Sequence, residues 1–279
     1  MKEIESNLCL PLLQEVWQQT LNWQPDPVQQ ASFQQLYQQI LQANQALNLT
    51  RITAPQEFWE KHLWDSLRGI LPWLSGETQE SKETEESGSH LQSDQGEVSE
   101  PEAEKPAIAP SSFHVIDIGT GAGFPGVPVA IVQPTWQITL MDSTRKKTAF
   151  LDTLIHDIAL QNATTLTDRA EQIGKTAPHR GHYDLALIRA VAGASVCAEY
   201  ALPLLKVGGV AVLYRGQWTD EEATSLRRAS HLLGGKLESV EDCATPLTQG
   251  VRHCIYLRKV KPTPATYPRP AGVPTHKPL

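Results

Sequence analysis

The sequence has few cysteines, no long hydrophobic run and no excess of positive charge, and each absence narrows the class of protein. The four cysteines, Cys9, Cys197, Cys243 and Cys254, have no paired spacing. They therefore predict neither a metal site nor a disulfide framework, as suits a reducing cytosol. No apolar run reaches the roughly 18 residues of a membrane span, and no basic stretch followed by an apolar signal core begins the sequence. We expect a cytoplasmic protein with no metal and no membrane association.

The net charge of −7 would argue against a nucleic-acid partner if it were evenly spread. Ten acids and two lysines lie between Glu77 and Lys105, whereas the remainder of the chain carries 22 bases and 21 acids. The acidity belongs to one segment and does not exclude RNA binding. Residues 75–112 are also poor in apolar residues, so we expect a disordered acidic insert there, acting as a linker or as an interaction tether.

Residues 1–74 have the periodicity of helices. Apolar side chains recur at helical spacing from Leu10 to Trp17 and from Phe33 to Leu41. A third helix is predicted to start near Pro55, with Thr53 as its cap. We expect these helices to form an amino-terminal region that packs on the main domain.

Residues 113–260 alternate between strand-like and helix-like segments, which indicates a mostly parallel sheet covered on both faces. Strands are predicted near 113–118, 137–141, 163–166, 183–188, 207–215, 236–242 and 251–258. Helices are predicted near 125–133, 144–159, 194–204 and 219–233. Only a loop, Ala244 to Gly250, separates the last two strands, which should therefore pair as an antiparallel edge hairpin. The predicted fold class is α/β, with a Rossmann-like, seven-stranded sheet.

Residues 261–279 are rich in proline, which is excluded from the interiors of helices and sheets. We therefore expect an extended tail. The tail is also basic, because it contains Lys261, Arg269 and Lys277 and no acid follows Asp242. Such a tail is either a loose terminus or an arm that lies on RNA phosphates.

The most informative segment is Val115 to Gly126, V-I-D-I-G-T-G-A-G-F-P-G. A buried strand leads into a glycine turn, and Asp142 stands nineteen residues after Gly123, at the end of the next predicted strand. Glycines let the backbone approach a ligand, and a carboxylate one strand away accepts bonds from ribose hydroxyls. The spacing differs from the dinucleotide motif G-x-G-x-x-G. With Asp117 before the first glycine, the segment resembles the first motif of class I S-adenosylmethionine methyltransferases; a glycine-rich turn in another α/β protein is the alternative.

The sequence lacks the groups that two common kinds of methyl transfer require. Amino groups of adenine or cytosine are usually methylated beside an Asn/Asp-Pro-Pro-aromatic loop after the fourth strand, but here that strand leads into Arg189 to Ala192. Carbon 5 of a pyrimidine requires a cysteine nucleophile, and none of the four cysteines follows a proline or threonine at a strand end. Ring nitrogen 7 of guanine has a free lone pair and needs no general base, so a site without these groups is compatible with this acceptor.

Six short motifs occur in order along the chain, at Asn48–Thr50, Lys61–Leu67, Asp117–Gly126, Asp142–Lys147, Arg169–Glu171 and Arg189–Ala190. Together with Y-P-R-x-x-G-x-P, from Tyr267 to Pro274, they resemble the bacterial 16S rRNA guanine-N7 methyltransferases, once called glucose-inhibited division protein B. The resemblance covers residues 1–74 and 113–279. Two departures stand out: the acidic insert is longer than the usual connection, and Pro270 stands where a base is common.

The resemblance implies a class I methyltransferase fold with S-adenosylmethionine bound at the carboxyl ends of the strands. The residues implied at the cofactor are Asp117, Gly119, Gly121, Gly123, Phe124, Asp142, Ser143, Thr144, Ala170, Glu171 and Arg189. Among them, Asp142 to Thr144 would hold the ribose and the adenine edge, and Ala170 and Glu171 would meet the adenine. Arg189 would face the cofactor carboxylate or the RNA, unless it forms a structural ion pair with Asp184 or another acid.

The basic residues near the predicted site and in the tail suit an RNA-binding surface. Its expected cations are Arg145, Lys146, Lys147, Lys259, Lys261 and Arg269. A solvated helix face is the alternative for Arg145 to Lys147. No catalytic side chain is implied, and His62 and Arg189 are the candidates for positioning the substrate. The expected partner of this protein, which we expect to be a monomer, is 16S rRNA or the small ribosomal subunit. A non-catalytic, cofactor-binding ribosome-assembly module and a methyltransferase for small molecules or proteins remain as alternatives.

Overall fold

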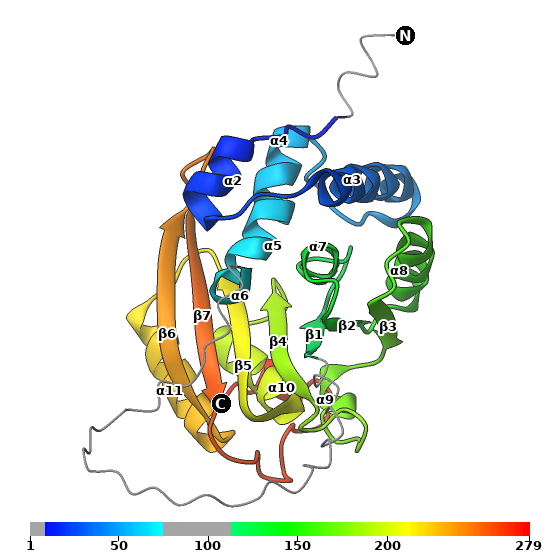
Figure 1. The fold of residues 1–279 in the computed structure, drawn as a ribbon. Coiled ribbons are helices and arrows are strands. Elements are labelled where there is room, and N and C mark those ends of the chain that lie inside the picture. Colours follow the sequence, from blue (N-terminus) through cyan, green and yellow to red (C-terminus); the bar gives the residue numbers. More distant parts are fainter. Residues whose placement is uncertain (1–8, 75–112) are drawn as a thin grey trace, which may run out of the picture.

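One seven-stranded sheet, in the order β3-β2-β1-β4-β5-β7-β6, organises the protein (Figure 1). The structure is a computed structural model that describes residues 9–74 and 113–279; the predicted acidic insert, 75–112, lies outside the described residues. The strands are β1 (His114–Ile118), β2 (Gln137–Asp142), β3 (Ala163–Thr167), β4 (Tyr183–Arg189), β5 (Leu205–Arg215), β6 (Gly235–Ala244) and β7 (Val251–Lys259).

The strand pairing confirms the predicted fold class. Strands β1 to β5 pair in parallel, and β7 runs antiparallel to both β5 and β6, which gives the expected edge hairpin. The chain leaves β1 toward β2 and β3, then returns to place β4 on the other side of β1. In open sheets of this kind, ligands bind beyond the carboxyl ends of the strands at this point of reversal.

Helices cover both faces of the sheet (Figure 1). The structure defines α2 (Gln14–Leu21), α3 (Pro27–Leu47), α4 (Pro55–Phe58), η1 (Trp59–Trp64), α5 (Asp65–Arg68), α6 (Leu71–Leu74), α7 (Gly126–Val132), α8 (Arg145–Asp157), α9 (Ala170–Ile173), α10 (Ala194–Ala201), η2 (Leu202–Leu204), α11 (Asp220–Leu232) and α12 (Val273–His276). Successive strand residues point to opposite faces, so Val115 belongs to a core with α3, α7 and α8, and Ile116 to a core with α10 and α11.

The amino-terminal helices pack against the first of these cores. The long helix α3 begins with a capping box, in which Asp26 accepts from the backbone of Gln29 while the Gln29 side chain bonds back. Helices α4 and α5 continue through a π-helical turn, η1. The prediction that Thr53 caps α4 is wrong. Ala54 is the residue before the helix, and no side chain caps it. The Thr53 carbonyl accepts a hydrogen bond from the Tyr37 hydroxyl at 2.6 Å.

The carboxyl-terminal tail, 261–279, is folded onto the domain. It contains the one-turn helix α12, which places Pro274 in its first turn, the position where proline needs no backbone donor. Thr263, Pro268 and Pro274 are buried. The tail is therefore neither wholly extended nor a loose terminus.

No helix in residues 9–74 or 113–279 has the length and apolar character to cross a membrane. All four cysteines are described and none forms a disulfide. Within the same ranges, no group of three or more His, Cys, Asp or Glu side chains is arranged to hold a metal ion.

Candidate functional site

A cavity of about 340 Å³ lies at the carboxyl ends of β1 to β4. We call it the strand-end cavity. Its lining comes from the ends of these strands, from the turns and helix starts that follow them, and from α10 and α12: Ile118, Gly119, Met141, Asp142, Ser143, Thr144, Lys147, Asp168, Arg169, Ala170, Glu171, Ala190, Val191, Ala192, Tyr200 and Thr275. The cavity therefore occupies the place where this topology binds ligands.

The glycine turn after β1 forms one wall of the strand-end cavity. The N–H groups of Gly119 and Thr120 both donate to the Met141 carbonyl, at 2.8 and 2.9 Å. Gly119, Gly121 and Gly123 have φ values of 72°, 60° and 99°, in the left-handed region that favours glycine. A Cβ on Gly119 would lie 2.6 Å from Cγ2 of Val191. Glycine is thus required both for the backbone conformation and for the close approach.

Asp117 lies beneath the glycine turn and is fully buried. Its Oδ2 accepts from the Thr120 hydroxyl at 2.6 Å and from the Gly126 N–H at 2.7 Å. Its Oδ1 has no hydrogen-bond partner among the described residues. Burial raises the pKa of Asp117 to about 6, against the lowering effect of those two hydrogen bonds. An unpartnered carboxylate oxygen in this position suits a site that receives a cationic ligand group.

Asp142 ends β2 and lines the strand-end cavity. Its Oδ1 accepts from the Thr144 N–H at 2.8 Å, and its Oδ2 accepts from the Gly121 N–H at 3.1 Å. Lys147 Nζ lies 3.5 Å from Oδ2. These contacts fix the carboxylate at the mouth of the glycine turn, where an acceptor for ribose hydroxyls was predicted. Ser143 and Thr144 line the cavity beside it.

Glu171 forms the opposite wall, at the start of α9. Its Oε1 accepts from the Gly272 N–H at 3.0 Å and from the Tyr200 hydroxyl at 3.3 Å, and Arg169 Nη2 lies at 3.5 Å. Burial alone would raise the pKa of Glu171, but the hydrogen bonds from Gly272 and Arg169 outweigh it and the pKa is lowered. The carboxylate is therefore charged and held in place by the carboxyl-terminal tail.

A second cavity, of about 390 Å³, adjoins the first, and we call it the arginine cavity. It is lined by Ile52, Lys61, His62, Asp65, Arg189, Ala190, Tyr214, Arg215, Gly216 and Arg252. Ala190 lines both cavities and has a φ of 56°, an uncommon conformation for a residue other than glycine. The turn after β4 is thus the wall that the two cavities share.

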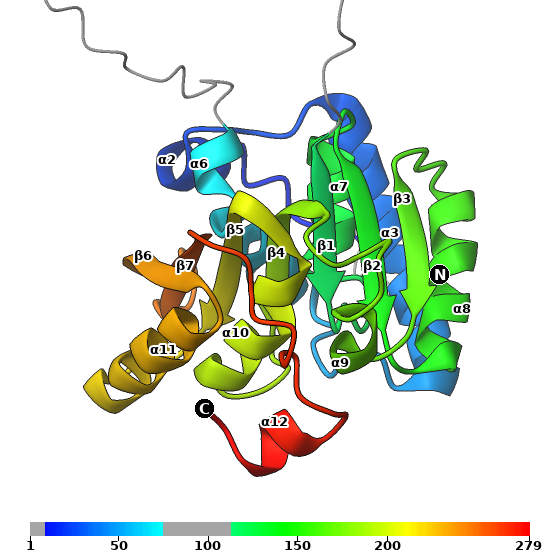
Figure 2. The ribbon, with the colours of Figure 1, turned by 90° about the horizontal axis from the view of Figure 1, so that it is seen from below.

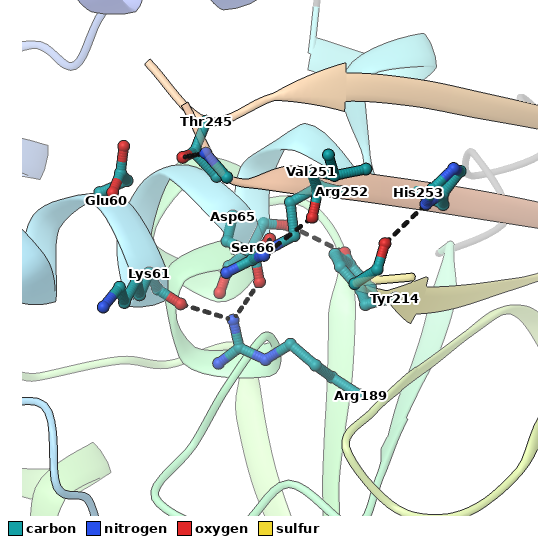
Figure 3. Close-up of polar contacts among 12 residues, drawn as sticks. Glu60, Lys61, Asp65, Ser66, Arg189, Tyr214, Thr245, Val251, Arg252 and His253 are labelled. Atoms are coloured by element: carbon teal, nitrogen blue, oxygen red, sulfur yellow. Dashed lines mark hydrogen bonds and ion pairs between the residues drawn. The ribbon is translucent and has the colours of Figure 1, made fainter. Parts of the chain in front are cut away.

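Asp65 joins two arginines across the arginine cavity (Figure 3). Arg189 Nη1 donates to Asp65 Oδ2 at 2.7 Å and to the Lys61 carbonyl at 3.0 Å. Arg252 Nε lies 3.2 Å from Asp65 Oδ1. The expected alternative partner of Arg189, Asp184, stands near the other end of β4 and binds Lys206 instead. Arg189 is therefore fixed by the amino-terminal helices, through the K-H-x-x-D-S segment.

His62 lies between Arg189 and the glycine turn. Its ring stacks on Phe124 at 4.3 Å with 6° between the planes. Arg189 Nη2 lies 3.5 Å from Nδ1, and Thr50 Oγ1 lies 2.9 Å from Nε2. A guanidinium only donates, so Nδ1 accepts and Nε2 carries the proton. Burial, with the charge of Arg189, lowers the pKa of His62 to about 3, so the ring is neutral at physiological pH.

The predicted RNA-binding cations do not form one surface. Arg145 and Lys146 are exposed at the start of α8, beside the strand-end cavity. Lys261 is also exposed. It follows β7, beside the amino ends of the parallel strands, and so it lies away from both cavities. Two others, Lys259 and Arg269, require correction because their charged groups are engaged inside the protein.

Lys259 is 3% exposed, and its ammonium donates to the Leu202 carbonyl and to the Thr263 hydroxyl. Burial lowers its pKa to about 8. The Arg269 guanidinium donates to both carboxylate oxygens of the fully buried Glu199, at 3.0 and 2.7 Å. Both side chains hold the tail onto the domain: Lys259 is buried, and the guanidinium of Arg269, whose side chain is 22% exposed, is paired with Glu199.

The structure brings six of the eleven expected cofactor residues into the strand-end cavity: Gly119, Asp142, Ser143, Thr144, Ala170 and Glu171. Asp117, Gly121, Gly123 and Phe124 build the turn beneath it, and Arg189 lines the neighbouring cavity. The sequence reasoning missed Tyr200 and Thr275 in the first cavity and Arg252 in the second. Thr275 directly follows the tail motif, which was the available signal; Arg252 lies in an ordinary strand and gave none.

Known proteins that are similar to this chain identify its family. A family model described as rRNA small subunit methyltransferase G matches residues 29–80 and 105–254. Two curated relatives have the name Ribosomal RNA small subunit methyltransferase G. The one from Nostoc punctiforme is 56% identical over 270 residues, 97% of this chain and 98% of the relative. The one from Trichormus variabilis is 55% identical over the same shares of both chains. The chain therefore belongs to the rRNA small subunit methyltransferase G family.

Proposed function

We propose that this protein transfers the methyl group of S-adenosylmethionine to N7 of a guanine in small-subunit rRNA. The observation that carries the proposal is the pair of adjoining cavities. One offers the glycine turn and carboxylates that a nucleoside-containing cofactor requires, and the other is lined by four cations and a single acid. A cationic cavity beside a cofactor site suits a phosphate-bearing acceptor better than a small neutral molecule.

The residues of the strand-end cavity fit the cofactor. Asp142 would accept from the ribose hydroxyls, and Ala170 and Glu171 would meet the adenine. Asp117 is fully buried and does not line the cavity, so it would act on the positive amino group only indirectly, through the glycine turn that it bonds. When bound, the cofactor supplies an electrophilic methyl group on a sulfonium. The protein's part is to place the acceptor in line and to exclude water, and positioning of this kind accounts for much of the acceleration.

The arginine cavity fits an acceptor that needs no general base. Its histidine is neutral, and both of its ring nitrogens are already engaged by Arg189 and Thr50. His62 therefore does not remove a proton; it stacks on Phe124 and fixes that ring beside the glycine turn. Guanine N7 attacks with a free lone pair, and the guanine ring becomes positive. Asp65, the single acid among the described lining residues, would face this developing charge.

Mass mapping of small-subunit rRNA tests the reaction directly. Cells that lack this protein are expected to lose one N7-methylguanine, and the purified protein with S-adenosylmethionine is expected to restore it to 16S rRNA or to small ribosomal subunits. An unchanged methylation pattern would favour a different acceptor or a non-catalytic assembly role.

We further propose that the protein acts in the cytoplasm as a monomer. Sedimentation of the purified chain measures its oligomeric state.

The cofactor site predicts a loss of affinity in Asp142→Ala. Removing the charged acceptor should weaken S-adenosylhomocysteine binding by about 1–3 kcal/mol, because ribose hydroxyls would lose their partner. Titration calorimetry measures this change. Asp152→Ala is the matched control, because it removes an exposed acid from α8 outside both cavities. Equal affinities of Asp142→Ala and the control would contradict the ribose assignment.

The acceptor site predicts a change in the salt dependence of RNA binding. Replacing Arg145, Lys146 and Arg252 with glutamine should lower the slope of log affinity against log salt by about 0.7–0.9 for each phosphate that is no longer neutralised. Filter binding to a small-subunit rRNA fragment measures the slope. A control with Arg227, Arg228 and Lys236 replaced removes the same charge from exposed positions on α11 and β6. If both triple variants shift the slope equally, the surface formed by Arg145, Lys146 and Arg252 is not the RNA site.

A further inference from the structure

The carboxyl-terminal tail runs from the amino ends of the parallel strands to their carboxyl ends. It leaves β7 at Lys259, beside the amino ends of the parallel strands, because β7 is antiparallel to β5. It ends beside the strand-end cavity, where Thr275 is a lining residue. In Figure 2 the tail, drawn in red, passes across the face that carries α9 and α10 and places α12 next to them. The tail therefore connects the amino ends of the parallel strands with the candidate cofactor site at their carboxyl ends.

Arg180 fixes the first half of this path. Its guanidinium donates to the carbonyls of Thr263 at 2.7 Å and Tyr267 at 2.8 Å, and to that of Gly174 beside α9. A side chain with five donors in a rigid fork is suited to hold several carbonyls at once. These Arg180 contacts in the first half of the path are made to the tail's backbone, so they do not depend on the side chains that the tail carries.

Glu199 and Arg269 fix the middle of the path. Glu199 lies on α10 with its side chain fully buried, and the Arg269 side chain is 22% exposed. The Arg269 N–H also donates to Glu199 Oε1 at 2.7 Å. This arrangement engages the charge of Arg269 inside the protein, which is the opposite of what an RNA-binding arm requires.

The end of the tail forms part of the wall of the strand-end cavity. The Gly272 N–H donates to Glu171 Oε1 at 3.0 Å. Tyr200, whose hydroxyl bonds the same carboxylate oxygen, lies 3.2 Å from the Thr275 hydroxyl. Glu171, Tyr200 and Thr275 all line the cavity. The three residues come from α9, α10 and α12, and the tail contacts complete the set.

We propose that residues 272–275 are part of the cofactor site: they hold Glu171 and supply Thr275 as a wall for the adenosine portion of the cofactor. This inference rests on the proposed assignment of the strand-end cavity to S-adenosylmethionine. Cofactor binding and docking of the tail then stabilise each other, because a ligand that contacts the docked tail favours the docked state. In this proposal the tail contributes to cofactor binding and is not an arm that binds RNA.

Truncation after Ala271 is the first test. The shortened chain keeps Arg269 and its bonds to Glu199 but omits Gly272 and Thr275. Its affinity for S-adenosylhomocysteine in titration calorimetry should fall about tenfold, the change that follows from removing one charge-assisted hydrogen bond and part of the wall. Thr275→Val removes only the hydroxyl and should weaken binding in the same direction, by less. Thermal denaturation of each variant confirms that the domain is folded.

Lys277→Gln is the matched control, because Lys277 is exposed and does not line the cavity. It should leave cofactor affinity unchanged. Normal cofactor affinity in the truncated chain, together with weakened binding to an rRNA fragment, would overturn the proposal in favour of an RNA arm. Asp142→Ala separates the two levels of inference. If Asp142→Ala weakens binding and truncation does not, only the role of the tail is wrong; if neither weakens it, the cofactor site itself is misplaced.

Hydrogen exchange gives a second readout that does not depend on a variant. Saturating S-adenosylhomocysteine should slow exchange of the Gly272 amide, whose hydrogen is bonded to Glu171. The amide of Lys236, on the edge strand β6 and outside the cavity lining, serves as the reference. Equal exchange at Gly272 with and without the ligand would contradict the coupling between cofactor and tail.

Discussion

Arg269→Ala is expected to lower the free energy of unfolding by about 3–5 kcal/mol, the cost of leaving a buried carboxylate without its cation. Glu199 has no solvent-exposed side-chain area. The Arg269 guanidinium donates to both of its oxygens through Nε and to Oε2 through Nη2, and the Arg269 backbone N–H donates to Oε1. Of these bonds, only the backbone one survives in the variant, and the carboxylate stays buried without the guanidinium charge. Urea denaturation measures the change.

An exposed ion pair provides the control for this prediction. Arg258 and Glu238 are each 35% exposed, and Arg258→Ala should cost less than about 1 kcal/mol. Adding Glu199→Gln to Arg269→Ala should recover part of the stability, because the neutral amide costs less to bury. Equal destabilisation by Arg269→Ala and Arg258→Ala would show that the tail contributes nothing through this pair.

The second large effect concerns two buried groups whose titrations oppose each other. Asp117 has a folded-state pKa of about 6 against an ordinary value of 3.8. Between these values the folded state binds more protons, so stability falls as the pH rises. His62 has a folded-state pKa of about 3 against 6.5. Between those values the unfolded state binds more protons, so stability rises with pH. In the overlap, between about pH 4 and 6, the two slopes cancel.

Single replacements should therefore expose the slope of the remaining group. Asp117→Asn should make stability rise between about pH 4 and 6, by roughly 3 kcal/mol relative to the native chain, and His62→Gln should make it fall by a similar amount. Urea denaturation at several pH values measures both, and the double variant should restore a flat profile. If the native chain, the two single variants and the double variant all show parallel profiles of stability against pH, burial of these two groups does not cause the pH dependence of stability.

The sheet was predictable because its signals are local. The strands β1, β2, β4 and β5 contain short apolar runs, and the glycine turn requires residues that stand next to one another in the sequence. Gly119, with a φ of 72° and Val191 close to it, is required by the backbone sterics of the turn itself. Asp142 was likewise predictable, because the end of a strand is defined by the run that precedes it. These positions match the structure.

The tail and the arginine cavity were harder to predict, because their contacts join distant parts of the chain. Arg269 and Glu199 are 70 residues apart, and Arg189 and Asp65 are 124 residues apart. Proline content shows that a segment is not the interior of a helix, but it does not show what the segment packs against. Lys259 was expected at the surface because lysines usually are; it is buried because the carbonyl of Leu202 and the hydroxyl of Thr263 provide partners there.

The bond between Gly272 and Glu171 also determines when the strand-end cavity can be completed during synthesis. The two residues are 101 positions apart. At translation rates of roughly 5–20 residues per second, Gly272 follows Glu171 by about 5–20 s. The glycine turn, Asp142 and Glu171 can all fold during this interval, whereas the wall that contains Thr275 is made later. A nascent chain therefore holds an incomplete cavity until Thr275 has left the ribosome.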